Sequence, residues 1–213
     1  MDSITQIVLG AACGEAVLGK KIGNRALLFG AIGGTIPDLD VFVGKWLFNH
    51  EIDAMAFHRG FMHSFLFAIL AAIGFGMLVF WIYNRGKRFG MTTRNQWMWL
   101  FFASIFTHPI LDSFTAYGTQ LFAPFSDYRV AFNNIAVADP LYTLPFLIAL
   151  IIMMCFKRTS TKRSLFLKIG LGISSLYMLF TFVNKYHVHG VYKQSLEDLK
   201  MNYVRFQTQP TIL

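Results

Sequence analysis

Three short motifs place imidazole and carboxylate side chains in patterns that suit a metal site. They read GTIPDLD at residues 34–40, HRGFMH at 58–63 and THPILD at 107–112. In the third motif, His108 and Asp112 are four residues apart, so a helix would present both side chains on one face. Neutral imidazole and carboxylate are suitable ligands for zinc and other transition metals. The motifs therefore predict a metal site, provided that the fold brings them together.

Each motif also has a simpler explanation when it is taken alone. Asp38 and Asp40 follow a proline and could cap a turn. His58 could contact lipid phosphates at a membrane surface, and His108 could be a buried histidine bonded to Asp112. One shared site explains all of these residues together, because an ionisable side chain at membrane depth is costly and is a functional candidate by default.

The composition is that of a membrane protein. Hydrophobic residues make up 55% of the 213 residues and charged residues only 14%, whereas soluble domains have about a quarter charged residues. The mean hydropathy is +0.49. The net charge of +8 comes in short clusters between apolar runs, which fits a topology signal and argues against a nucleic-acid partner. Both cysteines lie in apolar segments, so neither a disulfide framework nor a cysteine metal site is expected.

Six apolar segments are expected to be helices. Crossing a bilayer takes about 20 apolar residues, and the candidates for long spans are residues 64–83, 97–111, 141–156 and 165–183. Two earlier segments, 4–19 and 26–36, are shorter and rich in small residues. The first contains a GxxxG pattern from Gly10 to Gly14, which permits close helix packing.

The predicted fold is therefore all-α. It is a polytopic membrane helical bundle of about four long transmembrane helices plus a short N-terminal helical hairpin. We expect residues 1–184 to form the membrane domain and residues 185–213 to form an extramembrane tail.

The basic clusters predict how these segments are arranged in the bilayer. Lys and Arg favour the cytoplasmic side, which places the loops near residues 20–25, 84–96 and 157–164 there. Residues 37–63 and 112–140 then face the opposite side. All three motifs consequently meet at one surface, the extracytoplasmic face of a bacterial inner membrane, although the charge rule does not require this convergence.

At these motifs the sequence resembles the YdjM type of membrane-bound metal-dependent hydrolase. The resemblance rests on MDSITQIVLG, GTIPDLD, HRGFMHS, THPILDSFTAYGT and ADPLY, and it covers roughly residues 1–145. That family is distantly similar to zinc-dependent phospholipases C and single-strand nucleases, helical enzymes that cleave phosphoesters. The resemblance implies one or two divalent metal ions, most simply zinc. Many relatives have a histidine where this chain has Gln6, so a full three-zinc site is not expected. Relatives are often longer, which implies that the tail begins a further region.

The resemblance assigns roles to the residues of the three motifs. The implied metal ligands are Asp38, Asp40, His58, His63, His108 and Asp112. Asp38 and Asp40 are also the candidate catalytic residues. Asp40 would be a further ligand, a base for the attacking water or a carboxylate that orients a histidine ligand. A metal-activated water would attack an ester or phosphoester bond.

The candidate substrate-binding residues lie within and after the motifs: Arg59, Thr115, Tyr117 and Arg129. A guanidinium group matches phosphate oxygens bidentately, but each arginine could instead be an interfacial anchor, and for Arg129 that alternative is favoured. The long segment 113–139 carries several aromatic residues and could form a hood at the level of the lipid headgroups. The expected partner is accordingly a membrane lipid or a lipid-linked substrate.

A non-enzymatic membrane protein remains the alternative, either a metal or proton transporter or a lipid-binding scaffold with a structural metal site. Transport favours ionisable residues near mid-membrane and paired broken helices. A structural site saturates its metal with protein ligands, whereas a catalytic site keeps one position open for water.

Overall fold

Helix starts follow capping residues in the sequence. The structure is a computed structural model that describes residues 1–210, and of residues 54–56 only the backbone. Asp2 caps the first helix, Ser64 caps the fifth, and Thr93 forms a capping box with Gln96 at the sixth, each satisfying amide groups that a helix start leaves free. The α-helices are α1 (Ser3–Ile22), α2 (Asn24–Thr35), α3 (Asp40–Leu47), α4 (Glu51–Phe57), α5 (Phe65–Tyr83), α6 (Arg94–Ser113), α7 (Pro140–Met154) and α8 (Thr161–Asp198). Short 3-10 turns are η1 (Pro37–Leu39), η2 (Phe61–His63) and η3 (Gly86–Arg88).

The all-α prediction is confirmed, but the expectation of about four long transmembrane helices is wrong. Among the described residues, only α5 and α8 are long and apolar enough to cross a membrane, and the bent pair α2 and α3, with 43° between them, is a possible third span. The segment expected at 97–111 belongs to α6, whose polar residues lie at both ends. The apolar helix α7 has only 15 residues, short of the roughly 20 that a span requires.

The N-terminal hairpin is confirmed, and glycines explain its tight packing. A methyl group on Gly10 or Gly30 would overlap the backbone of the opposite helix, and the same holds for Gly14 against Ala26. Because only hydrogen atoms separate the two backbones, α1 and α2 approach as closely as small-residue motifs in membranes allow.

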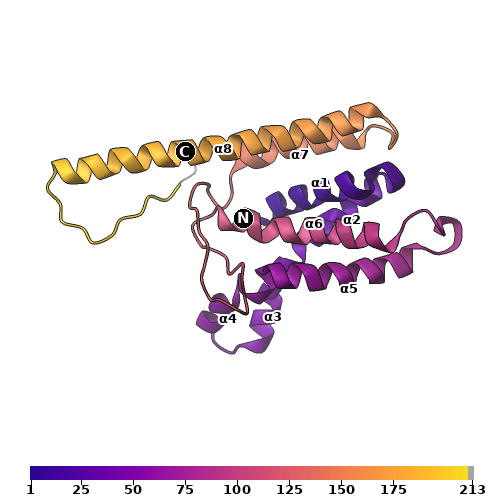
Figure 1. The fold of residues 1–213 in the computed structure, drawn as a ribbon, viewed down its shortest axis with the longest axis horizontal. Coiled ribbons are helices and arrows are strands. Elements are labelled where there is room, and N and C mark those ends of the chain that lie inside the picture. The colour runs from indigo at the N-terminus through magenta and orange to yellow at the C-terminus, as the bar shows by residue number, and fades with distance from the viewer. Residues whose placement is uncertain (211–213) are drawn as a thin grey trace.

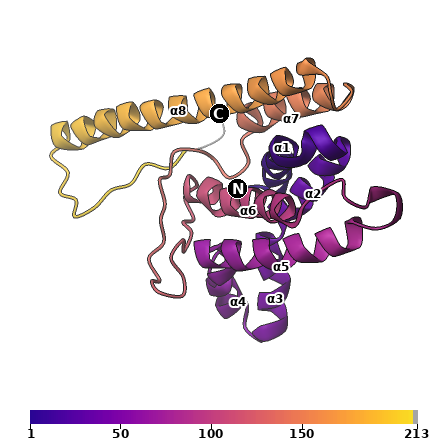
Figure 2. The ribbon, with the colours of Figure 1, turned by 45° about the vertical axis from the view of Figure 1, so that its right-hand side comes forward.

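The remaining helices pack on both sides of this hairpin. Figures 1 and 2 show α5 and α6 on one side and the antiparallel pair α7 and α8 on the other. One apolar cluster joins the hairpin to α5 and α6 through residues such as Leu18, Trp97 and Phe101. A second joins it to α7 through Phe146 and Met153 and to α8 through Leu167. These clusters fix the relative positions of the helix ends.

Helix α8 runs without a break past residue 184, where we expected the membrane domain to end. In Figure 1 its C-terminal half extends beyond the bundle, and the chain that follows turns back toward it. Residues 211–213 of the expected tail lie outside the described residues.

One end of the bundle collects all three motifs. It comprises the start of α1, the break between α2 and α3, the turn η2 before α5, the end of α6 and the loop that follows it (Figure 1). The basic loops lie at the other end.

Candidate metal centre

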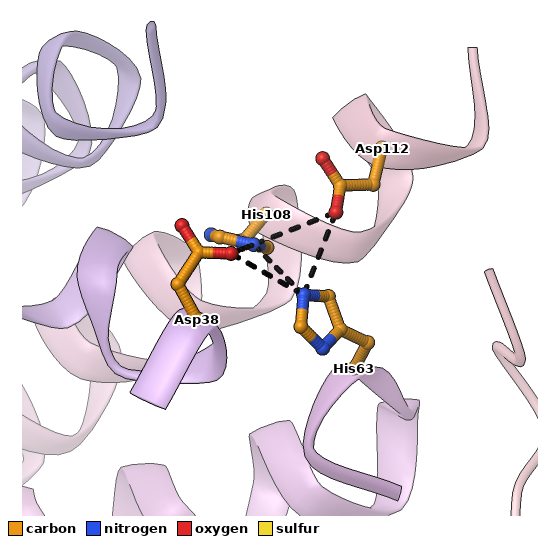
Figure 3. Close-up of side chains that lie close together, drawn as sticks. All are labelled: Asp38, His63, His108 and Asp112. Atoms are coloured by element: carbon orange, nitrogen blue, oxygen red, sulfur yellow. Dashed lines mark hydrogen bonds and ion pairs between the residues drawn. The ribbon is translucent and has the colours of Figure 1, made fainter. Parts of the chain in front are cut away.

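Four side chains from the three motifs converge at this end of the bundle. Asp38, His63, His108 and Asp112 each offer one ligand atom, and these atoms all lie within 4.8 Å of one another. Figure 3 shows the four side chains pointing toward a common centre from η1, η2 and the last turns of α6. The predicted convergence of the motifs is thus observed.

The two histidines face each other across this centre. His63 Nε2 and His108 Nε2 are 3.2 Å apart. Asp38 Oδ1 lies 3.3 Å from His108 Nε2 and 3.6 Å from His63 Nε2. Asp112 Oδ2 lies 3.5 Å from His63 Nε2 and 3.6 Å from His108 Nε2. Two ring nitrogens and two carboxylate oxygens therefore meet in one small space.

The groups on the far side of each ring decide which ring nitrogen carries the proton. His108 Nδ1 lies 2.6 Å from the carbonyl oxygen of Gly34. Since a carbonyl only accepts, Nδ1 carries the proton and the Nε2 of the neutral ring presents a lone pair. His63 Nδ1 lies 3.0 Å from Asp40 Oδ2, which favours the same tautomer. All four facing atoms are then acceptors, an arrangement that a cation would stabilise, so the donor set fits a divalent metal.

In the absence of a metal, a proton can neutralise part of this cluster. Burial disfavours the charged imidazole of His63, but the carboxylates of Asp38 and Asp40 outweigh burial and raise the pKa of His63 above its ordinary value. A metal ion would have to displace that proton, because a ligating imidazole must be neutral.

Asp40 and His58 lie outside the group of four. Asp40 is buried behind His63, and its oxygens contact His58 Nδ1 at 2.8 Å, the Arg59 amide at 2.9 Å and His63 Nδ1 at 3.0 Å. The His58 side chain is 35% exposed. The positions of both residues suit orienting a ligand, as carboxylates behind metal-bound histidines commonly do.

Arg59 enters the site from a strained backbone. It has a φ of 61°, a conformation that a residue other than glycine rarely adopts and that often marks functional positions. Its side chain is buried, donates to Thr115 Oγ1 at 2.9 Å, and places Nε 3.5 Å from Asp112 Oδ2. The guanidinium lies 5.2 Å from the centre of the Tyr117 ring. Arg129 instead donates to the His58 carbonyl, at 3.3 Å.

Two groups that hold candidate metal-binding side chains in place could not be identified from the sequence motifs. The first is the Gly34 carbonyl, since no side-chain pattern reveals a backbone acceptor. The second is Gln6, noted only as a departure from relatives. Its Nε2 donates to Asp112 Oδ1 at 2.8 Å and to the His108 carbonyl at 3.3 Å. Its Oε1 is buried without a hydrogen-bond partner among the described residues.

The centre opens to one side through Asp38. This side chain is 24% exposed, whereas those of the other three cluster residues are at most 1% exposed. A cavity of about 430 Å³ lies here, with Asp38, His58 and Arg59 among its lining residues. Exposed apolar side chains, including Leu39 and Phe42, also line it.

Comparisons with known proteins agree with a bacterial membrane protein. The chain is 29% identical over 159 residues to the uncharacterized protein YfhP of Bacillus subtilis (strain 168), covering 71% of this chain and 46% of YfhP. It is 33% identical over 129 residues to the inner membrane protein YbcI of Escherichia coli (strain K12), covering 59% of this chain and 69% of YbcI. This chain thus spans less than half the length of YfhP. No solved structure matches it. The YdjM inner membrane protein family matches residues 1–188, and the chain belongs to that family.

Proposed function

We propose that this member of the YdjM inner membrane protein family is a metal-dependent hydrolase that cleaves an ester or phosphoester bond in a lipid or lipid-linked substrate. The observation that carries the proposal is the facing pair of histidine Nε2 atoms, 3.2 Å apart, with two carboxylate oxygens beside them. Of the four cluster residues, Asp38 is the one that is partly exposed. A cluster that exposes one of its ligands to a cavity suits catalysis better than a closed structural site does.

The residues that would hold the metal are Asp38, His63, His108 and Asp112. Their nitrogen and oxygen donors suit zinc. When bound, such a cation supplies Lewis acidity that activates water and polarises the scissile group.

The two acids of the PDLD motif then have different roles. Both oxygens of Asp40 are occupied, by His58 on one side and by Arg59 and His63 on the other. We therefore assign Asp40 to orienting His63. Asp38 Oδ2 is buried and has no hydrogen-bond partner among the described residues, and the Asp38 residue lines the cavity. Asp38 is thus placed to accept the proton of an attacking water.

Arg59 is the candidate to bind a phosphate oxygen of the substrate. Its guanidinium is fixed beside the metal cluster by Thr115 and covered by the exposed Tyr117 ring, and a guanidinium presents paired donors that match phosphate. Arg129 contacts the backbone of the same turn, so we assign it a supporting role.

A lipid substrate follows from where the cavity lies. It opens at the end of the bundle, between the start of α1 and the break from α2 to α3, and exposed Leu39 and Phe42 line it. A polar site with apolar walls at that level suits a headgroup with its acyl chains still in the bilayer. The basic loops at the other end favour an extracytoplasmic site.

Ion transport is the second candidate, and one observation favours it. Asp38 lies in the break between α2 and α3, which meet at 43°, and broken helices bind coupling ions in transporters. The centre lies at the start of α5 and the end of α6, however, whereas transport sites lie near the bilayer midplane.

Metal analysis and turnover of the same preparations test the proposal. The purified protein and its Asp38→Ala, His108→Ala and His187→Ala variants would be measured for bound metal and for hydrolysis of a panel of lipid phosphoesters. We expect the first two variants to lose both metal and activity. His187→Ala is the matched control, because His187 is an exposed residue on α8, and it should keep both.

The outcomes separate the candidates. Unchanged metal content in both site variants would reject the metal centre itself. Metal that is bound by the parent protein without any hydrolysis, and that crosses the membrane of proteoliposomes, would favour transport. Bound metal with neither hydrolysis nor flux would indicate a structural site.

A further inference from the structure

A second polar cavity lies at the end of the bundle opposite the metal centre. It has a volume of about 660 Å³ and lies between the C-terminal half of α1 and the start of α8. One carboxylate and four cationic side chains line it: Glu15, Lys20, Arg158, Arg163 and Lys168. Nothing in the proposed hydrolysis uses this cavity.

A buried ion pair forms the inner wall of the cavity. Arg163 donates from Nε and Nη2 to the two oxygens of Glu15, at 2.6 and 2.7 Å, and from Nη1 to the Phe156 carbonyl at 3.1 Å. Both side chains are buried. The pair is neutral as a unit and joins α1 to α8, so it fixes the shape of the wall and leaves three cationic residues around the cavity.

These three cations have few partners within the protein. Lys20 and Lys168 make no hydrogen bond or ion pair with the residues that the structure describes, and both are exposed. Arg158 donates one bond from Nη1 to the Lys21 carbonyl, which leaves other N–H groups of its guanidinium available. Three positive charges that share one cavity repel one another, and an anion between them would relieve that repulsion.

The start of α8 adds uncharged donors to the same cavity. Thr159, Ser160, Thr161 and Ser164 line it, and the Ser160 side chain does not cap the helix. The first-turn amides of α8 are therefore not capped by Ser160. They lie at the N-terminal end of a long helix, which carries a partial positive charge. Hydroxyl and amide donors beside lysine and arginine are the groups that bind phosphate oxygens.

We propose that this cavity binds the phosphate group of an anionic phospholipid. The lipid source is favoured over free phosphate because Leu165 and Leu167 also line the cavity and α8 is a candidate membrane span whose Leu165 and Ile169 are exposed. A headgroup held by the cations would leave its acyl chains against this apolar face. Basic residues at the ends of spans interact in this way with anionic lipids.

Native mass spectrometry of the detergent-purified protein tests the site, because it counts individual bound lipids. The probes are phosphatidylglycerol and the zwitterionic phosphatidylcholine. The test variant is Lys20→Gln with Lys168→Gln. The matched control is Lys157→Gln with Lys162→Gln, which removes the same charge from the same end of the bundle at residues that do not line the cavity. All four lysines are exposed, so folding should be preserved in both.

The parent protein should bind one phosphatidylglycerol in preference to phosphatidylcholine. The cavity variant should bind it about 25-fold more weakly, since each of the two lysines near anionic lipid contributes roughly fivefold. The control pair should retain most of the affinity. Equal losses in the two variants would show a diffuse surface attraction and overturn the proposal, and so would equal binding of the two lipids. Displacement of the lipid by millimolar inorganic phosphate would overturn the assignment to a lipid.

Discussion

Replacing Asp40 with asparagine tests whether Asp40 binds the metal itself or orients a residue that does. Asp40 contacts His63 Nδ1 at 3.0 Å on the face opposite the cluster, and it also contacts His58 and the Arg59 amide. Asparagine keeps the size and one acceptor but removes the negative charge. His63 therefore keeps its position, while its Nε2 becomes a weaker donor to a metal.

The size of the effect follows from this geometry. Loss of a carboxylate behind a metal-bound histidine typically weakens metal affinity about 10- to 100-fold, which corresponds to about 1.4–2.8 kcal/mol. We expect Asp40→Asn to fall in this range and to retain metal at saturating concentration. His108→Ala, which removes one of the four converging ligands, should lose measurable binding altogether.

Competition with a chromophoric zinc chelator at neutral pH measures both variants on one scale. Asp53→Asn is the control, because Asp53 is an exposed acid on the nearby helix α4, and its affinity should match that of the parent protein. If Asp40→Asn abolished binding as completely as His108→Ala, Asp40 would be a ligand. An unchanged affinity would show that the contact with His63 does not tune the metal. Either result would refute the division of roles between the two acids.

Three other expectations test the packing and the substrate side of the site. Gly30→Ala should destabilise the protein by about 1–3 kcal/mol or more, because the added methyl group would overlap the Gly10 backbone. Gly74→Ala should not destabilise it, because the space around Gly74 is open. Thermal unfolding in detergent measures both variants. Glu15→Gln should destabilise by about 3–5 kcal/mol by leaving Arg163 buried and unpaired, and adding Arg163→Met should recover much of that loss in a double-mutant cycle. Arg59→Gln should keep its metal, as measured by elemental analysis. It should bind a phosphoester at least about tenfold more weakly in a titration, since a hydrogen bond to a charged group contributes about 1.5–3 kcal/mol. Loss of metal in this variant would contradict the assignment of Arg59 to substrate binding.

The sequence predicts the meeting of the motifs because that prediction needs only the direction of each helix. Basic loops assign one end of every segment to the cytoplasmic side, so the ends that carry the motifs all lie on the opposite side. The charge rule does not by itself bring them into contact. The spacing of His108 and Asp112 likewise needs only a helix, and both side chains reach the centre. The number of membrane-spanning helices is harder to predict, because it depends on how apolar each segment is along its whole length. Helix α6 combines a packed apolar middle with polar ends, and such a helix lies inside a bundle without meeting the criteria for a span.

The choice between Asp38 and Asp40 was beyond the sequence for a geometric reason. Side chains two residues apart on a helical turn are rotated by roughly 200–240° about its axis, so the two carboxylates point in nearly opposite directions. Which one faces the Nε2 atoms of His63 and His108 depends on where the turn η1 begins, and a pattern of residue types does not fix that. His58 and His63 pose the same problem, because they flank the irregular turn that contains the left-handed Arg59.

Glycine packing and metal chemistry are linked at one residue. Gly34 lies where α2 crosses α1, and a methyl group there would approach the Gln6 carbonyl to 2.5 Å. Its own carbonyl holds His108 Nδ1 and so fixes the tautomer that turns Nε2 toward the centre. The close approach of α1 and α2 also brings Gln6 against Asp112. Gly34, which lets the hairpin pack closely, therefore also orients one of the four ligands, and the packing that it permits places Gln6 against a second.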